Sequence, residues 1–138
     1  MRIMAIDYGD AHTGIAISDP TGFLAGFTTV INAYRPEVVA EQVAALAKEH
    51  GVEELVLGHP INMDGTRGPR SEKAQAMKAL LEETTSLPVV LWDERRTTID
   101  AHQILMNSGK NAKKRKKVVD AVAASLILEG YLTYKKNH

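Results

Sequence analysis

The first third of the chain alternates short apolar runs with turn residues. Apolar runs at Arg2–Tyr8, Gly14–Ser18 and Phe23–Ile31 have the length and composition of strands. Residues 9–13 read as the first turn, and the sequence DPTG at positions 19–22 supplies a second turn with strong turn chemistry. Three strands joined by short turns predict an antiparallel meander.

From position 36 onward, the apolar residues recur at the spacing of helices, with two further strands between them. Pro36 suits a first helical turn, and Gly51 would end that helix. The later strands are expected at Glu54–Gly58 and Pro88–Trp92. The predicted helices span Pro36–His50, Ser71–Thr84, Thr98–Met106 and about Lys113–Tyr134.

The resulting element order is β-β-β-α-β-α-β-α-α. Hairpin-joined strands followed by helix-separated strands predict an α/β fold with a mixed five-stranded sheet and helices on both faces. At 138 residues, with no linker or repeat in the pattern, the chain is expected to form a single domain over residues 1–138.

Composition and charge limit the compartment and the kinds of ligand that the sequence suggests. The chain has no cysteine, which excludes disulfides and thiolate metal sites and fits a reducing cytoplasm. Its apolar runs are shorter than the ~18 residues of a membrane span, and its start turns polar too early for a signal peptide. Net charge is zero, but six cations and no acid lie between Lys110 and Lys117. Such a local basic patch suits phosphate binding.

Three carboxylates stand at or near the ends of predicted elements. Asp7 is close to the end of the first strand, Glu94 follows the fifth strand, and Asp120 lies one to two turns into the last helix. If the later strands run parallel to the first, Asp7 and Glu94 share one edge of the sheet. That edge is where open α/β sheets place their ligands.

The last helix can bring its own carboxylate to this edge. Asp120 shares a helical face with Ala123, Ala124 and Ile127, at i+3, i+4 and i+7. The two alanines would let the helix approach the sheet closely. Asp120 is therefore expected to point inward, while the neighbouring lysines reach solvent.

Converging acids repel one another unless cations neutralise them. Oxygen-only ligands favour Mg²⁺ or Mn²⁺, and two such ions about 4 Å apart activate a water and stabilise the leaving oxygen of a phosphodiester. Basic residues nearby would hold the polyanion without reading its sequence. The candidates for nucleic-acid binding are Arg95, Arg96, Lys113, Lys114, Arg115, Lys116 and Lys117, with Asn62, Arg67 and Arg70 from the loop after the fourth strand.

Each acid also has a purely structural interpretation. Asp7 could be a turn residue, Glu94 could pair with an adjacent arginine or cap a helix, and Asp120 could form an ion pair with Arg115 or a lysine. The conjunction of all three favours a site. The histidines His12, His59 and His102 lack metal-cage spacing and are expected in solvent or in turns.

Four blocks together resemble the YqgF (RuvX) family, whose members are described as Holliday-junction resolvases and as nucleases that mature the precursor of small-subunit ribosomal RNA. The blocks are DYGDAHTGIAISD, LGHPINMDGTRGPRS, WDERRTT and KKRKKVVDAVAASLIL. The resemblance implies a ribonuclease H-like fold in which Asp7, Glu94 and Asp120 are the metal-binding catalytic acids. His59 and Arg96 depart from the family pattern, but neither removes a carboxylate.

The function expected from residues and resemblance is endonucleolytic hydrolysis of structured nucleic acid, with preference for the 5′ end of pre-16S rRNA in ribosome biogenesis. Holliday junction resolution, which would favour a homodimer, stays open. So do a non-catalytic nucleic-acid-binding module and, less favoured, a phosphotransferase. With only two Phe, one Trp and four Tyr, an extended base-stacking platform is not expected.

Overall fold

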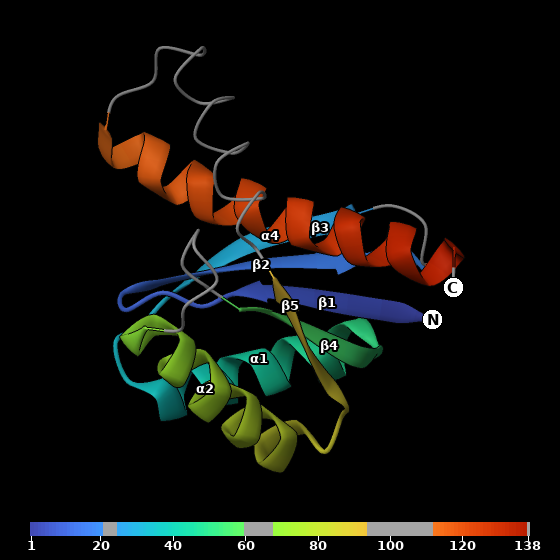
Figure 1. The fold of residues 1–138 in the computed structure, drawn as a ribbon, viewed down its shortest axis with the longest axis horizontal. Coiled ribbons are helices and arrows are strands. Elements are labelled where there is room, and N and C mark those ends of the chain that lie inside the picture. Colours follow the sequence, from blue (N-terminus) through green and yellow to red (C-terminus); the bar gives the residue numbers. More distant parts are fainter. Residues whose placement is uncertain (21–24, 60–67, 94–111, 138) are drawn as a thin grey trace.

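A computed structural model of the chain describes residues 1–20, 25–59, 68–93 and 112–137. Its framework is a five-stranded sheet in the order β3-β2-β1-β4-β5 (Figure 1). The strands are β1 (Arg2–Asp7), β2 (His12–Ser18), β3 (Ala25–Asn32), β4 (Val52–His59) and β5 (Val89–Asp93). The first strand of the chain is thus the central strand of the sheet.

Strand directions make the sheet mixed. β2 pairs antiparallel with both β1 and β3, whereas β4 pairs parallel with β1 and β5 pairs parallel with β4. The carboxyl ends of β1, β3, β4 and β5 therefore lie at one edge of the sheet. The parallel direction of the later strands, on which the predicted convergence of acids depended, is confirmed.

Helices cover both faces of the sheet (Figure 1). Helices α1 (Pro36–His50) and α2 (Pro69–Thr85) pack on one face, and α4 (Ala112–Asn137) crosses the other. The face under α1 and α2 carries large side chains, among them Ile6, Ile15 and Leu57, all fully buried. This packing buries the larger of two hydrophobic clusters and holds the sheet edge in place.

The ends of α1 and α2 follow from local sequence. Pro36 and Pro69 occupy the first turns, where a proline loses no helical hydrogen bond. Gly51 ends α1 in the left-handed conformation at φ 68°, which costs a glycine little. Ser86 ends α2 at φ 60° in the same way, without the help of a glycine.

The face under α4 carries two small residues on its central strands. Ala5 and Ala16 are directly paired across β1 and β2, and both are completely buried. Ala124 and Ile127 of α4 pack in the same cluster. Alanine against alanine lets the helix lie close to the sheet, so the predicted inward face of the last helix is confirmed for the residues that the structure describes.

Sequence-based boundaries agree with the structure to within a few residues. The α1 prediction is confirmed at both ends, whereas each strand and each of the other two described helices differs from its prediction by one to three residues at one end or both. The helix predicted at Thr98–Met106 lies outside the described residues. Within the described ranges, no helix is long and apolar enough to cross a membrane.

Candidate active site

Asp7 is the last residue of the central strand. It pairs with Gly14 of β2, and residues of β1 with the same parity, Ile3 and Ala5, pack in the cluster under α4. Because side chains alternate along a strand, Asp7 lies on the α4 face of the sheet, where it is partly buried. Gly14 places no side chain beside it, so the neighbouring strand leaves room at this carboxylate.

The ends of the parallel strands lie level with Asp7. Through the β1–β4 and β4–β5 registers, Ile6 aligns with Leu57 and Leu91, and the next step aligns Gly58 with Trp92. β5 ends at Asp93, one residue past this level. Glu94 is the next residue in the chain and lies outside the described residues.

The turn after β1 is built around Gly9. A Cβ at this position would lie 2.5 Å from the backbone oxygen of His12, so any other residue would distort the turn. His12 begins β2, and its Nδ1 is 2.6 Å from the side-chain oxygen of Asn32 at the end of β3. The predicted turn between the first two strands is confirmed, although β2 begins at His12, before the predicted end of the turn.

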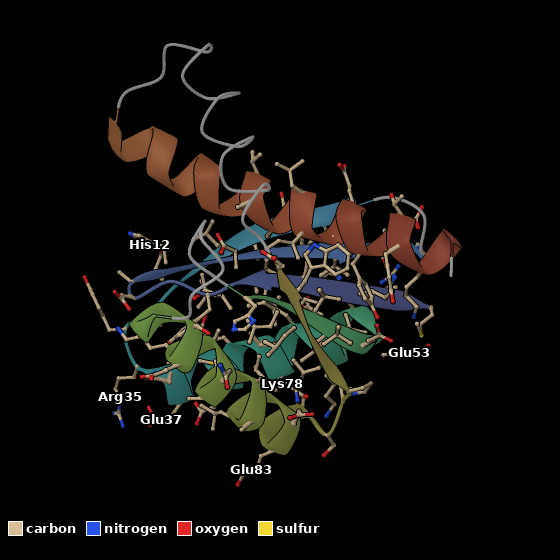
Figure 2. All side chains as sticks on the ribbon, in the orientation of Figure 1. His12, Arg35, Glu37, Glu53, Lys78 and Glu83 are labelled. Atoms are coloured by element: carbon tan, nitrogen blue, oxygen red, sulfur yellow. The ribbon has the colours of Figure 1, made fainter. Side chains whose placement is uncertain are left out.

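Side chains of opposite charge cluster along the edge where these turns lie. Lys73 of α2 donates to the Asp10 carboxylate at 3.0 Å, which joins the turn after β1 to α2. In Figure 2, His12 lies at this edge of the sheet, and Glu53 lies at the opposite edge. Both partners of the Asp10–Lys73 ion pair are mostly exposed, so the pair contributes little to stability and can rearrange around a ligand.

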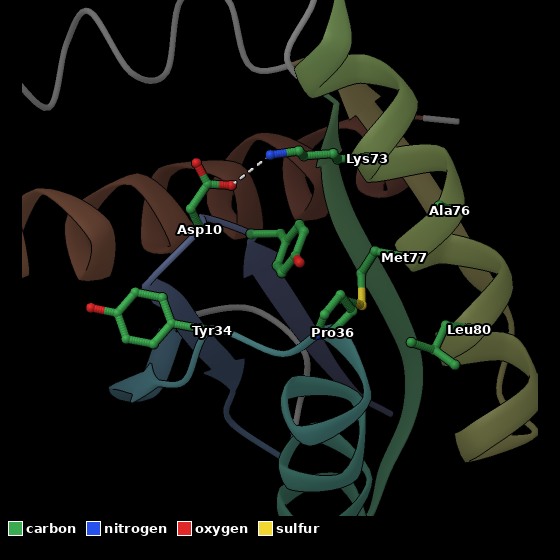
Figure 3. A pocket seen from close by; sticks show the side chains of 8 residues that line it. Asp10, Tyr34, Pro36, Lys73, Ala76, Met77 and Leu80 are labelled. Carbon is green, nitrogen blue, oxygen red and sulfur yellow. Dashed lines mark hydrogen bonds and ion pairs between the residues drawn. The ribbon is translucent and has the colours of Figure 1, made fainter.

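A pocket of about 400 Å³ opens at the same edge, on the side of α1 and α2 (Figure 3). Its lining residues come from three separate parts of the chain and were not predicted as site residues: Tyr8, Asp10, Tyr34, Pro36, Lys73, Ala76, Met77 and Leu80. Burial and, secondarily, the Asp10 carboxylate raise the pKa of Tyr8 above the ordinary value of a tyrosine hydroxyl.

His59 corrects one sequence-based expectation. It was expected in solvent or in a turn, but it ends β4 and is 7% exposed. Its Nε2 is 2.6 Å from Oγ of Ser71, which is fully buried in the first turn of α2. This contact ties the start of α2 to the end of β4, so His59 helps to build the sheet edge at which Asp7 lies.

A buried hydroxyl also lies close to the site. Thr13 is completely buried, and its Oγ1 has no hydrogen-bond partner among the described residues. Thr13 immediately precedes Gly14, the strand partner of Asp7. An unsatisfied buried hydroxyl carries an energetic cost, and sequence patterns gave no signal for it.

Most of the predicted site residues fall where side chains are not described. Asn62, Arg67, Glu94, Arg95 and Arg96 lie outside the described residues, and of Arg70, Asp120 and Lys113–Lys117 only the backbone is described. Among the described side chains, no group of three His, Cys, Asp or Glu could hold a metal ion. Of the three predicted acids, only Asp7 belongs to that set.

A central strand that ends in a carboxylate, in a mixed sheet of this order with a helix across one face, defines the ribonuclease H-like class of fold. Thermus thermophilus RuvC, solved with a Holliday junction substrate, superposes with a TM-score of 0.65 at 14% identity over 99% of this chain and 96% of its own. Fowlpox virus resolvase, solved with Holliday junction DNA, gives a TM-score of 0.60 at 12% identity over 98% and 99%. The predicted fold is thereby confirmed.

Sequence comparison narrows the class to one family. A family model described as "RuvX: Holliday junction resolvase" matches residues 1–134. A protein of Halothermothrix orenii named "Putative pre-16S rRNA nuclease" is 45% identical over 135 residues, covering 98% of this chain and 96% of the relative. The chain belongs to the RuvX family, and the resemblance noted in the sequence is confirmed.

Proposed function

We propose that residues 1–138 form one metal-dependent endonuclease domain that hydrolyses phosphodiester bonds of structured nucleic acid in the cytoplasm. The observation that carries this proposal is the position of Asp7 at the carboxyl end of the central strand, on the face crossed by α4. Family membership supports the same chemistry, since curated relatives are named as nucleases and the family as resolvases.

The packing of α4 supports a place for Asp120 in the site. Tyr131 of α4 donates to Glu54, which pairs with Ile3 in the β1–β4 register. Eleven residues separate Asp120 from Tyr131, a helical rise of about 16 Å. The four residues from Ile3 to Asp7 extend about 13 Å along the strand.

The rise along α4 from Tyr131 back to Asp120 and the length of β1 from Ile3 to Asp7 both run toward the same edge of the sheet. In Figure 1, the first turns of α4 lie at the edge where β1 ends, and both chain termini lie at the opposite edge. Asp120 stands one turn before Ala123 and Ala124, which are buried against the sheet. The backbone of α4 is thus positioned to bring Asp120 level with Asp7.

For Glu94, the support comes from strand register and parity. Val90 and Trp92 pack against the cluster under α4, and Glu94 has the same parity in the sequence. β4 separates β5 from β1, so about 10 Å lies between the two strand ends. We propose Glu94 as the third acid of the site, because it directly follows the end of β5.

The donor set fits a hard divalent cation. Asp7, Glu94 and Asp120 offer only carboxylate oxygens, and Gly14 leaves space beside the partly buried Asp7. Mg²⁺ or Mn²⁺, as two ions, would supply water activation and charge stabilisation at the leaving oxygen. The role of the three side chains is to hold that charge at the level where the strands end and to orient the attacked phosphate.

The basic residues are assigned to the nucleic-acid backbone. α4 begins at Ala112, so five cations at positions 113–117 precede Asp120 on the same helix by about one to two turns. Phosphate contacts of this kind release counterions when the complex forms. The remaining residues assigned to nucleic-acid binding are Asn62, Arg67, Arg70, Arg95 and Arg96.

Salt dependence tests the basic run. With Lys113, Lys114, Arg115, Lys116 and Lys117 replaced by Gln, the slope of log K against log [salt] should become shallower by nearly one for each phosphate that the variant no longer neutralises. A control variant, Lys48→Gln with Lys78→Gln, removes two cations from α1 and α2 and should leave the slope unchanged. An equal slope for the five-residue variant and the wild type would remove the run from the proposed interface.

The substrate is proposed to be precursor rRNA rather than a DNA junction. This preference follows from the naming of the Halothermothrix orenii relative, whereas the family description and the solved complexes name Holliday junctions. Cleavage of a 5′-extended 16S rRNA fragment should exceed cleavage of a four-way DNA junction under equal Mg²⁺. The reverse order would assign the chain to junction resolution, for which a two-fold dimer supplies one site per cleaved strand.

A further inference from the structure

A pocket lies beside Asp7 at this edge of the sheet, and the proposed chemistry does not use it. Tyr8 directly follows Asp7, so the two Cα atoms are about 3.8 Å apart. Tyr8 has the opposite parity and packs against the cluster under α1 and α2. The carboxylate and the pocket therefore lie on opposite sides of one sheet edge, within a single residue of each other.

The pocket lining combines aromatic and apolar surface with a polar rim. Pro36, Met77 and Leu80 contribute apolar surface, and Tyr34 stands on the other side of the opening (Figure 3). Tyr34 is 80% exposed, which is unusual for a tyrosine that only supports the fold. A volume of about 400 Å³ lies within the range of small-molecule pockets.

The polar groups fit the edges of a nucleobase and its phosphate. Asp10 can accept a hydrogen bond from an exocyclic amino group, as carboxylates do with cytosine. Lys73, which is paired with Asp10 at 3.0 Å, can turn to a phosphate because its side chain is 57% exposed. Tyr34 offers a ring on which any base can stack.

We propose that this pocket receives one unpaired, amino-bearing base of the substrate strand, next to the phosphate that divalent ions bound at Asp7 would hold. This inference rests on the proposed nuclease function and adds to it a specificity determinant. A backbone that crosses the sheet edge at Asp7 can turn its next base into the pocket on the other side. A base drawn out of its helix in this way also fixes the register of the attacked bond. A single pocket of this kind is compatible with the lack of an extended stacking platform.

The test measures binding with Mg²⁺ present and with RNA whose phosphodiester linkages are replaced by non-hydrolysable ones, so that it does not depend on cleavage. A labelled RNA hairpin with an unpaired loop is compared with a series in which one loop base at a time is replaced by an abasic site. With the wild type, one abasic position should weaken binding about 5- to 140-fold, the range for removal of one base–aromatic stack. Replacing cytosine by uracil at that position should weaken binding less, and Asp10→Asn should abolish this difference.

A double-mutant cycle that combines Tyr34→Ala with the abasic substitution tests the role of the Tyr34 ring. Tyr34→Ala should bind the intact hairpin as weakly as the wild type binds the abasic one, with no further weakening when both changes are combined. Tyr34→Phe keeps the ring and should restore binding. Tyr134→Ala removes another exposed tyrosine, on α4, and should bind as the wild type does.

Three outcomes would overturn the proposal: equal abasic penalties in wild type and Tyr34→Ala, unchanged binding by Tyr34→Ala, or no position-specific penalty in the wild type. Competition by free cytidine or adenosine monophosphate that depends on Tyr34, without any abasic effect, would also overturn it in favour of a free nucleotide ligand. A different result would refute the proposed nuclease function. If no substrate is cleaved with Mg²⁺ or Mn²⁺ but the Tyr34-dependent base penalty is found, the pocket stands without the nuclease.

Discussion

Replacing Ala124 by leucine tests whether the close approach of α4 positions the site. Ala124 is completely buried and packs in the cluster that contains Ala5 and Ala16, themselves fully buried. Leucine adds three carbon atoms to the helix in the cluster where the sheet contributes the alanines Ala5 and Ala16. Overpacking of this kind costs about 1–3 kcal/mol, which for a chain of this size lowers the melting temperature by about 3–10 °C.

The expected loss of activity is larger than the loss of stability. Ala124 lies one turn from Asp120, so a helix that is displaced by about 1 Å carries this carboxylate away from Asp7. A misplacement of that size can cost about 100-fold in rate. Single-turnover cleavage of the preferred substrate, measured well below the melting temperature, gives the rate, and thermal unfolding of the same sample gives the stability.

A second leucine variant serves as the control. Thr133 lies on an exposed part of α4, so Thr133→Leu adds similar bulk to the same helix without contacting the sheet. It should retain wild-type cleavage and stability. If Ala124→Leu also cleaves at the wild-type rate while it unfolds at a lower temperature, the helix contact stabilises the fold but does not position the site, and the reasoning is wrong.

Two further predictions concern stability. Thr13→Val should raise the free energy of unfolding by about 1 kcal/mol in urea titrations, because valine keeps the shape and removes a buried hydroxyl without a described partner; an unchanged or lower value would contradict this. Tyr131→Phe should cost about 1–2 kcal/mol, because it removes the hydrogen bond to the Glu54 carboxylate. Burial and that bond raise the pKa of Tyr131, so the wild type should lose stability as the pH rises above about 10, and the variant should lose less; parallel alkaline profiles would contradict it.

Much of the fold could be predicted from the sequence, because the residues that begin and end a helix lie within or next to that helix. The span of α1 follows from a proline in its first turn, an apolar face of period 3.6 and a glycine that ends it at positive φ. Strand ends were less predictable, since they depend on pairing. β2 begins at His12 because that residue pairs with Asn32 of β3, which no local pattern shows.

The candidate site also has one part that the sequence predicts and other parts that it does not. The position of Asp7 was predictable, because a carboxylate at the end of a buried strand is visible in the sequence and the parallel direction of β4 and β5 follows from their connecting helices. The buried contact between His59 and Ser71 was missed, because it joins a strand end to a helix start across a loop. The pocket was missed for the same reason, since its wall joins the turns after β1 and β3 to the middle of α2.

The central claim is that three carboxylates far apart in the sequence form one metal-dependent nuclease site. Its most direct test is cleavage of precursor rRNA and four-way DNA junctions with Mg²⁺ or Mn²⁺ by Asp7→Asn, Glu94→Gln and Asp120→Asn, each checked for wild-type folding. Glu53→Gln and Glu129→Gln are matched controls at exposed positions of β4 and α4. Loss of cleavage in all three acid variants, with full cleavage in both controls, is the predicted result. Full cleavage by any one of the folded acid variants would contradict the three-carboxylate site.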